Sequence, residues 1–167
     1  MYFCWHVFFH SEMAAEWFDA IKKGNIQFVH EHVSEYKCTR DENDLTALMN
    51  LAMKNDQQSL HIVNILLQWE AGIQNSSGIS ALMIAAACGN MDMFQVLCTR
   101  EIQLKDKNNF NAYAWAVFGK QKSVRDYIIQ HYFQSQVSCY PKDYLVNLKL
   151  SKPQKDLVNM AKKTYLR

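Results

Sequence analysis

The sequence predicts an all-α solenoid of about four helix-turn-helix repeats, followed by an additional C-terminal segment. Three observations lead to this prediction. Related segments recur every 31 to 34 residues through most of the 167-residue chain. Each complete unit begins with a residue that can cap a helix N-terminus, namely Thr46, Ser80 and Asn111. Only five Gly and two Pro occur, which favours helices over a chain of many tight β-turns.

Composition places the chain among folded globular proteins. Apolar residues make up 49% and charged residues 20%, so the chain has enough apolar material for a core. A formal net charge of +2 by itself indicates neither nucleic acid nor an acidic partner. Five cysteines at irregular spacing favour free thiols in a reducing compartment over a disulfide framework. We therefore expect a cytoplasmic protein, with nuclear or cytoskeletal association left open.

Residues 1–15 are expected to form an N-terminal extension that is disordered or separate from the repeats. The apolar run in MYFCWHVFFH has seven or eight residues and is broken by His6. A membrane span needs about 20 apolar residues, and a signal peptide needs a basic start and a small-residue cleavage site. The sequence MAAEWFDAIKKGN, which begins at Met13, itself looks like a natural start.

The clearest unit begins at Asn75. Its Ser77-Gly78 pair predicts a turn, because Gly readily takes the positive φ that many turns need. Ser80 can then cap a short helix of strong helix formers that starts at Ala81. Gly89-Asn90 ends this helix, and a second helix with an apolar face follows. Neither helix can bury its apolar side alone, so the unit must stack on its neighbours.

The other units are found by shifting this one along the chain. A shift back by 34 residues places Thr46 on Ser80, and a shift forward by 31 places Asn111 there. Three extra residues near Asp56–Ser59 are expected to lengthen the inter-helix loop of the second unit. The first unit, Trp17–Val33, is expected to begin directly with its inner helix. The array then covers residues 16–134, with units at about 16–40, 41–74, 75–105 and 106–134.

The third unit resembles an ankyrin repeat, whose usual pattern runs D-x-x-G-x-T-P-L-H-x-A-A-x-x-G-H-x-x-I-V-x-L-L. The D, G, T and G-H positions are occupied by Asn75, Gly78, Ser80, Gly89 and Asn90. Ala81 replaces the proline and Met83 the histidine, a variant similar to the divergent short ankyrin arrays of some protists. The resemblance implies an ankyrin solenoid and non-catalytic binding of a protein partner.

The same resemblance implies a partner-binding surface on the concave face. In ankyrin proteins, partners contact variable residues beside the turn glycine and at the end of the inner helix. The residues at these positions are Asn43, Leu45, Met53, Lys54, Ser77, Ile79, Cys88, Asn108, Phe110 and Phe118. We interpret Leu45, Ile79 and Phe110 as exposed anchors, because apolar and aromatic anchors usually dominate binding. The alternative is that these three side chains pack against neighbouring hairpins.

Residues 135–167 are expected to form a linker and a basic helix. The polar segment Ser135–Asp143 predicts a loop. Apolar residues alternate with other residues in Tyr144–Leu150, which predicts a short extended segment, and a helix is predicted from Pro153. Residues 142–167 include seven basic and two acidic residues, a net charge of +5. The rest of the chain has 11 basic and 14 acidic residues. Two roles stay open, a cap on the last repeat or a binding tail. A tail that binds nucleic acid or an anionic membrane is the alternative function.

The sequence contains no recognisable catalytic, metal or cofactor motif. Cys4, His6 and His10 offer zinc ligands, but no second pair follows at finger spacing. His30 and His32 are two apart on a predicted helix, so they point about 200° apart around its axis. No glycine-rich phosphate loop, nucleophile elbow or kinase signature occurs. We therefore expect a monomer that is not an enzyme, needs no cofactor and takes no small-molecule substrate.

Overall fold

The computed structural model describes residues 2–54, 56–138, 140, 155 and 159, with side chains from residue 13 onward except 57, 58 and 134. The helices are α1 (Tyr2–Lys23), α2 (Ile26–Tyr36), α3 (Ala47–Ala52), α4 (Gln57–Glu70), α5 (Ala81–Cys88), α6 (Met91–Glu101), α7 (Ala112–Phe118), α8 (Lys122–Tyr132) and the π-helix η1 (Phe133–Val137). Within the described ranges there is no strand, only an isolated bridge between Gln74 and Ser80. The extended segment expected at Tyr144–Leu150 and most of the helix expected from Pro153 lie outside the described residues.

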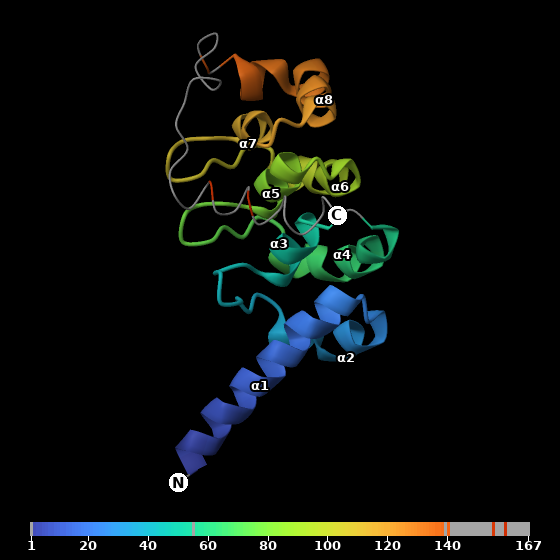
Figure 1. The fold of residues 1–167 in the computed structure, drawn as a ribbon, viewed down its shortest axis with the longest axis vertical. Coiled ribbons are helices and arrows are strands. Elements are labelled where there is room, and N and C mark those ends of the chain that lie inside the picture. The colour runs from blue at the N-terminus through green and yellow to red at the C-terminus, as the bar shows by residue number, and fades with distance from the viewer. Residues whose placement is uncertain (1, 55, 139, 141–154, 156–158, 160–167) are drawn as a thin grey trace.

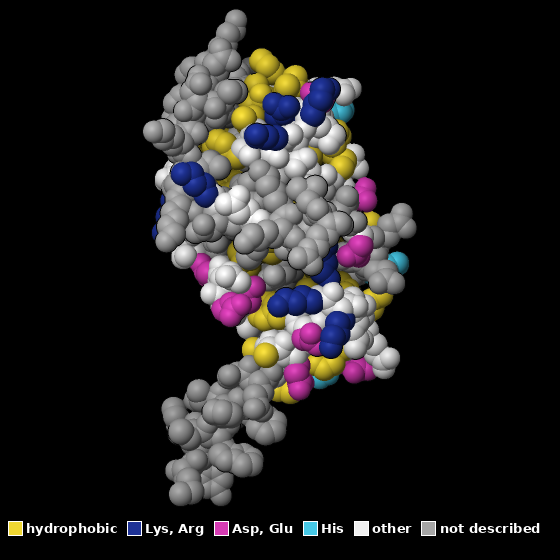
Figure 2. All heavy atoms as spheres, viewed as in Figure 1, with side chains coloured by type: hydrophobic (Ala, Val, Ile, Leu, Met, Phe, Trp, Pro, Cys, Tyr) yellow, Lys and Arg dark blue, Asp and Glu magenta, His cyan; other side chains and the backbone are white. Residues whose placement is uncertain are grey.

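The helices form four antiparallel pairs that stack in chain order (Figure 1). The inner helices α1, α3, α5 and α7 follow one another, and the outer helices α2, α4, α6 and α8 follow beside them. Loops project on the inner side before α3, α5 and α7. Figure 2 shows acidic side chains over the loop before α3 and basic ones over the loop before α7. The predicted all-α solenoid of four units is confirmed.

Helix N-caps define where most of the helices begin. Thr46 Oγ1 accepts the Met49 N–H at 3.4 Å, and Asn111 Oδ1 accepts the Ala114 N–H at 3.2 Å, as the sequence predicts. Ser80 occupies the N-cap position of α5 but makes no side-chain capping bond to the helix. Three outer helices are capped in the same way as α3 and α7, by Asn25, Asp56 and Asn90.

One continuous core runs through the described units. Each inner helix contributes large buried side chains, including Trp17, Leu48, Leu82 and Trp115. Helix α5 packs against both α3 and α7, and seven of its eight residues, all but Cys88, are buried. Its alanines allow the neighbouring helices to approach closely. Each unit therefore depends on its neighbours to bury its apolar side chains.

The second unit differs from the third in how its three additional residues are used. Helix α3 has six residues and α4 has 14, against eight in α5 and 11 in α6. Asp56 caps α4, with its Oδ1 accepting the Ser59 N–H at 2.6 Å. The inter-helix loop is longer, as expected, with residues 53–56 against residues 89–90 in the third unit. The insertion in addition lengthens the outer helix, because the cap at Asp56 begins α4 earlier.

Both ends of the array differ from the interior. Helix α1 runs through the boundary expected after residue 15, and no hairpin precedes the first unit in the described residues. At the other end, η1 continues directly from α8 and packs on α7 and α8. Gln136, buried within η1, donates from Nε2 to the Ile102 carbonyl at 2.6 Å. The boundary expected between residues 134 and 135 thus falls inside a helix that packs on the fourth unit.

Candidate partner-binding surface

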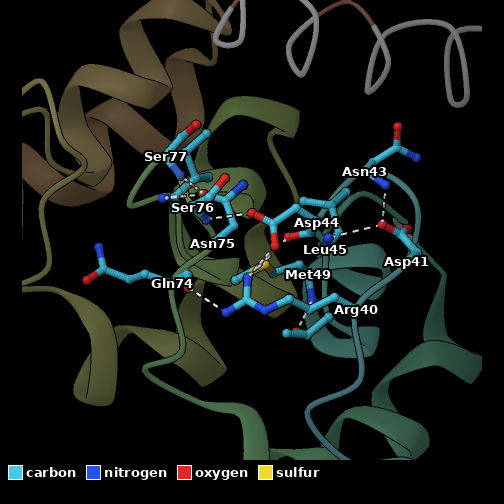
Figure 3. Close-up of polar contacts among 12 residues, drawn as sticks. Arg40, Asp41, Asn43, Asp44, Leu45, Met49, Gln74, Asn75, Ser76 and Ser77 are labelled. Carbon is cyan, nitrogen blue, oxygen red and sulfur yellow. Dashed lines mark hydrogen bonds and ion pairs between the residues drawn. The ribbon is translucent and has the colours of Figure 1, made fainter.

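The loops before α3, α5 and α7 form three hairpins of one design. In the first, Asp41 Oδ1 accepts the N–H groups of Asn43 at 2.8 Å and Leu45 at 3.0 Å (Figure 3). Asn75 and Asp106 make the equivalent two bonds in the other hairpins, at 2.8 to 3.0 Å. An Asp or Asn side chain suits this position because it can bond the backbone two residues further on. The side chain at the start of each loop therefore shapes the turn.

A residue with positive φ closes each of these turns. The φ angles are 60° at Asp44, 79° at Gly78 and 65° at Asn109. Asp and Asn tolerate this left-handed conformation, which explains how two of the hairpins form without glycine. Gly78 has a second constraint, because a Cβ there would lie 2.8 Å from the backbone nitrogen of Lys107.

Polar contacts join the first hairpin to the second. Asp44 accepts a hydrogen bond from Arg40 Nη1 at 2.8 Å and another from the Ser76 N–H at 2.6 Å (Figure 3). Arg40 Nη2 also donates to the Gln74 carbonyl at 2.9 Å. Hydrogen bonds from Ser76, and then from the Arg40 guanidinium, lower the pKa of the Asp44 carboxyl. The carboxylate is thus held in its ionised form between two repeats.

The second hairpin is joined to the third in a similar way. The Lys107 N–H donates to the Ser77 carbonyl at 3.1 Å, and Gln74 Nε2 donates to the Lys105 carbonyl at 2.9 Å. The three hairpins consequently form one continuous surface, residues 40–45, 74–79 and 105–110. We call this surface the hairpin edge.

The three predicted apolar anchors belong to these hairpins, but their side chains are buried and not exposed on the hairpin edge. Leu45 and Ile79 are each 1% exposed and Phe110 is 7% exposed, so the interpretation of them as exposed residues is wrong. Each directly precedes the N-cap of an inner helix, where an apolar residue commonly packs back against the helix. Phe110, for example, meets the ring of Phe118 edge-on at 5.2 Å between centroids. All three side chains therefore lie in the core, and Phe110 packs against a residue of its own unit.

The other seven predicted contact residues divide by exposure. Met53 and Phe118 are buried, Lys54, Ser77 and Cys88 are half-buried, and Asn43 and Asn108 are exposed. Lys54 Nζ donates to the carbonyls of Ile21, at 3.1 Å, and Lys22, so it joins the first two units. Burial raises the pKa of the Cys88 thiol to about 12, which keeps it protonated at neutral pH. Asn43, Ser77 and Asn108 are the predicted residues that the edge presents.

Sequence reasoning missed the residue next to each of these at the hairpin tip. Glu42, Ser76 and Lys107 are exposed, one in each hairpin. Each directly follows the Asp or Asn that shapes its turn. The tip of such a turn has few neighbours, so the turn chemistry visible in the sequence is the signal that indicates these positions. Among the described inner-helix residues, Tyr113 and Val117 of α7 are half-buried apolar side chains.

Two buried carboxylates also escaped the sequence analysis. Glu70, the last residue of α4, is 1% exposed and accepts the N–H groups of Leu48 at 2.7 Å and Cys38 at 3.1 Å. Glu101, the last residue of α6, makes the same two bonds at 2.8 and 3.0 Å to amides 34 positions further along. Burial raises the pKa of both carboxyl groups, and the bonds from backbone amides oppose that shift. Both side chains bind the backbone of their own array.

Metal-ligating and membrane-spanning features were sought over the same residues. Within the described part of the chain, no three His, Cys, Asp or Glu side chains come together as a metal site would require. None of the described helices combines the length and the hydropathy needed to cross a bilayer.

Comparison with known proteins identifies the family. A family model for ankyrin repeats, in three copies, matches residues 51–138, just over half of the chain. The chain therefore belongs to the ankyrin-repeat family. A search of the curated proteins found no match.

Among solved structures, the chain is similar to one in the crystal structure of the yeast ribosomal protein Rps3 in complex with its chaperone Yar1. The match has 18% sequence identity and a TM-score of 0.60, and it covers 72% of this chain and 93% of that chain. At this identity the likeness shows a shared fold.

Proposed function

We propose that this ankyrin array is a non-catalytic module that binds a protein partner along the hairpin edge and the adjoining concave face. One observation carries the proposal. Three hairpins with the same pattern of turn hydrogen bonds are joined by further hydrogen bonds into a single edge, and each presents exposed tip side chains. Ankyrin arrays are built for such binding because stacked units leave an extended concave surface.

Pre-organisation of the edge supports the proposal. The turns are shaped by Asp41, Asn75 and Asp106, and hydrogen bonds connect neighbouring hairpins, so little loop entropy remains to be lost on binding. The accessible tips are polar, and the half-buried side chains of Tyr113 and Val117 on the inner helix α7 add apolar area. A polar surface with a small apolar patch is typical of non-obligate protein interfaces.

The roles of the buried acids support a binding module over an enzyme. A catalytic carboxylate must face a substrate, whereas Glu70 and Glu101 are saturated by backbone amides of the array. Asp106 is likewise bound by the N–H groups of its own turn and by Trp115 Nε1 at 3.2 Å. These acids hold the fold together.

The proposal is tested by affinity capture from the source cell with three forms of the full-length chain. The edge variant carries Asn43→Arg, Ser76→Arg and Asn108→Arg, all at exposed tip positions. A matched control carries Gln27→Arg, Gln68→Arg and Gln130→Arg, at exposed positions of the outer helices. We expect the control to retain the partners of the native chain and the edge variant to lose them.

The same experiment can overturn the proposal. If the edge variant and the native chain capture the same proteins, the binding face lies elsewhere. If the retained material is nucleic acid or anionic lipid and is lost when residues after Ser151 are removed, the basic segment is the binding element.

A further inference from the structure

We propose that the C-terminal segment, residues 141–167, docks on the hairpin edge of its own chain, with its basic side chains at the first hairpin. The inference rests on the proposed function, since it places an internal occupant on the surface assigned to the partner. A partner would then have to displace this segment in order to bind.

The first argument is where the chain leaves the described array. The Tyr140 hydroxyl accepts the Asn111 N–H at 3.0 Å and donates to the Asn109 carbonyl at 3.3 Å. Both residues belong to the third hairpin or to the start of α7. The segment that follows Tyr140 therefore begins at the hairpin edge and not beside the outer helices.

The second argument is the charge along the edge. Residues 40–44 (RDEND) carry three acidic and one basic side chain, a net charge of −2. Residues 74–78 carry none, and residues 105–109 (KDKNN) carry two basic and one acidic. Figure 2 shows the same sequence of charge, with acidic side chains over the first hairpin and lysines over the third. A basic occupant that starts at the third hairpin is consequently drawn toward the first.

The occupant matches this surface in charge and in length. Residues 142–167 have a net charge of +5, while the rest of the chain has 11 basic and 14 acidic residues. An extended chain of 27 residues reaches up to about 90 Å, and two repeats span on the order of 20 Å at usual helix packing distances. The tether gives the segment an effective concentration of about a millimolar. Because the first hairpin is solvent-exposed, the docking is expected to be weak and sensitive to salt.

The test is zero-length carbodiimide cross-linking of the full-length chain, which joins a carboxylate to a lysine amine in direct contact. Cross-links in the monomer fraction are mapped by mass spectrometry at about 20 mM and about 500 mM salt, since screening lengths differ several-fold between them. We expect links from Glu42 to lysines of the segment, which are Lys142, Lys149, Lys152, Lys155, Lys162 and Lys163. Their yield should fall several-fold at the higher salt.

Two variants provide the comparison. Glu42→Gln removes the exposed carboxylate of the first hairpin, and Glu31→Gln removes an exposed carboxylate of α2. We expect the first change to abolish the links to residue 42 and to lower the total yield of links to the segment at least threefold, and the second to change that total little.

The proposal is overturned if the segment links mainly to outer-helix acids such as Glu31 and Glu35. It is equally overturned if the links to Glu42 form only between two copies of the chain. Because no partner is present in this experiment, a negative result leaves partner binding on the edge untouched. Failure of partner capture, conversely, leaves these cross-links in place.

Discussion

The interior units and the end units of this array end their outer helices in different ways. The last residue of the outer helix is Glu70 or Glu101 in the two interior units and Tyr36 or Tyr132 in the two end units. The interior carboxylates bind one amide in the inner helix of their unit and one in the preceding loop. The same position therefore joins backbone segments inside the array and packs a ring at its ends.

The end units show why no carboxylate is needed there. In the first unit no described hairpin loop offers an amide, and Tyr36 stacks on Trp17 with 6.0 Å between centroids. In the fourth unit the chain beyond α8 makes different contacts, since Gln136 Nε2 donates to the Ile102 carbonyl and the Tyr140 hydroxyl accepts the Asn111 N–H. A buried acid is thus found where two backbone amides need an acceptor, which is the condition under which its burial is tolerated.

Replacing an interior carboxylate is expected to have the largest effect. Glu101→Leu leaves the buried Leu82 amide and the part-buried Gly72 amide without an acceptor. An unsatisfied buried amide costs about 1–3 kcal/mol, so we expect the free energy of unfolding to fall by about 3 kcal/mol. The equivalent change in the fourth unit, Tyr132→Leu, removes only part of a half-buried ring and is expected to cost about 1 kcal/mol. Urea denaturation followed by far-UV circular dichroism measures both. Equal losses would remove the distinction between interior and end units.

The N-caps provide the next comparison. Asn90 is buried, caps α6 through the Met93 N–H at 3.1 Å, and also donates to the Lys54 carbonyl of the preceding unit. Asn25 is exposed and caps α2 through the Phe28 N–H at 3.1 Å. We expect Asn90→Ala to cost about 2 kcal/mol and Asn25→Ala about 1 kcal/mol or less. Thermal unfolding of both variants at the same protein concentration measures these changes. A larger loss of stability in Asn25→Ala than in Asn90→Ala would contradict the prediction.

The pH dependence of stability tests the interior carboxylates directly. Burial raises the folded-state pKa of Glu70 and Glu101 above the ordinary value of 4.5, so folding favours their protonated forms. That contribution is complete below pH 4.5 and is lost as pH rises through the raised pKa values. We expect the melting temperature to decline over that range and the decline to be smaller in the Glu70→Gln/Glu101→Gln variant. If the melting temperature depends on pH in the same way in the native chain and the variant, then groups other than Glu70 and Glu101 cause that dependence.

Changes at the hairpin tips are expected to have the smallest effect on stability. Glu42, Asn43 and Asn108 are exposed, so substitution by Gln or Arg should change the free energy of unfolding by less than about 0.5 kcal/mol. Urea midpoints within error of the native chain would show this. A larger loss would mean that the tips support the fold, and that a binding defect of the edge variant is not specific.

Much of the fold follows from local patterns. The caps at Thr46 and Asn111 match the sequence predictions. Each depends on groups within about five residues of one another, and such contacts form in any context that permits a helix or a turn. The effect of the insertion near Asp56 was predicted only in part, because inserted residues can extend either the loop or the outer helix.

The candidate surface was harder to predict. Leu45, Ile79 and Phe110 follow the exposed hairpin tips by two or three residues, yet all three are buried. A residue in a hairpin faces solvent or core according to how the next repeat packs against it, and that packing involves residues about 30 positions away. The exposed tip residues Glu42, Ser76 and Lys107, by contrast, were overlooked although the local turn chemistry indicates them.

The chain's local chemistry is enough to specify helices, caps, turns and a repeat of 31 to 34 residues. Stacking of the repeats then determines which hairpin residues face the solvent. It also gave Glu70 and Glu101 their roles, since the amides they accept lie 22 and 19 residues away in α3 and α5. The physical reason is distance along the chain: short-range bonds can be inferred from neighbouring letters, whereas burial and long-range hydrogen bonds exist only once the units have stacked.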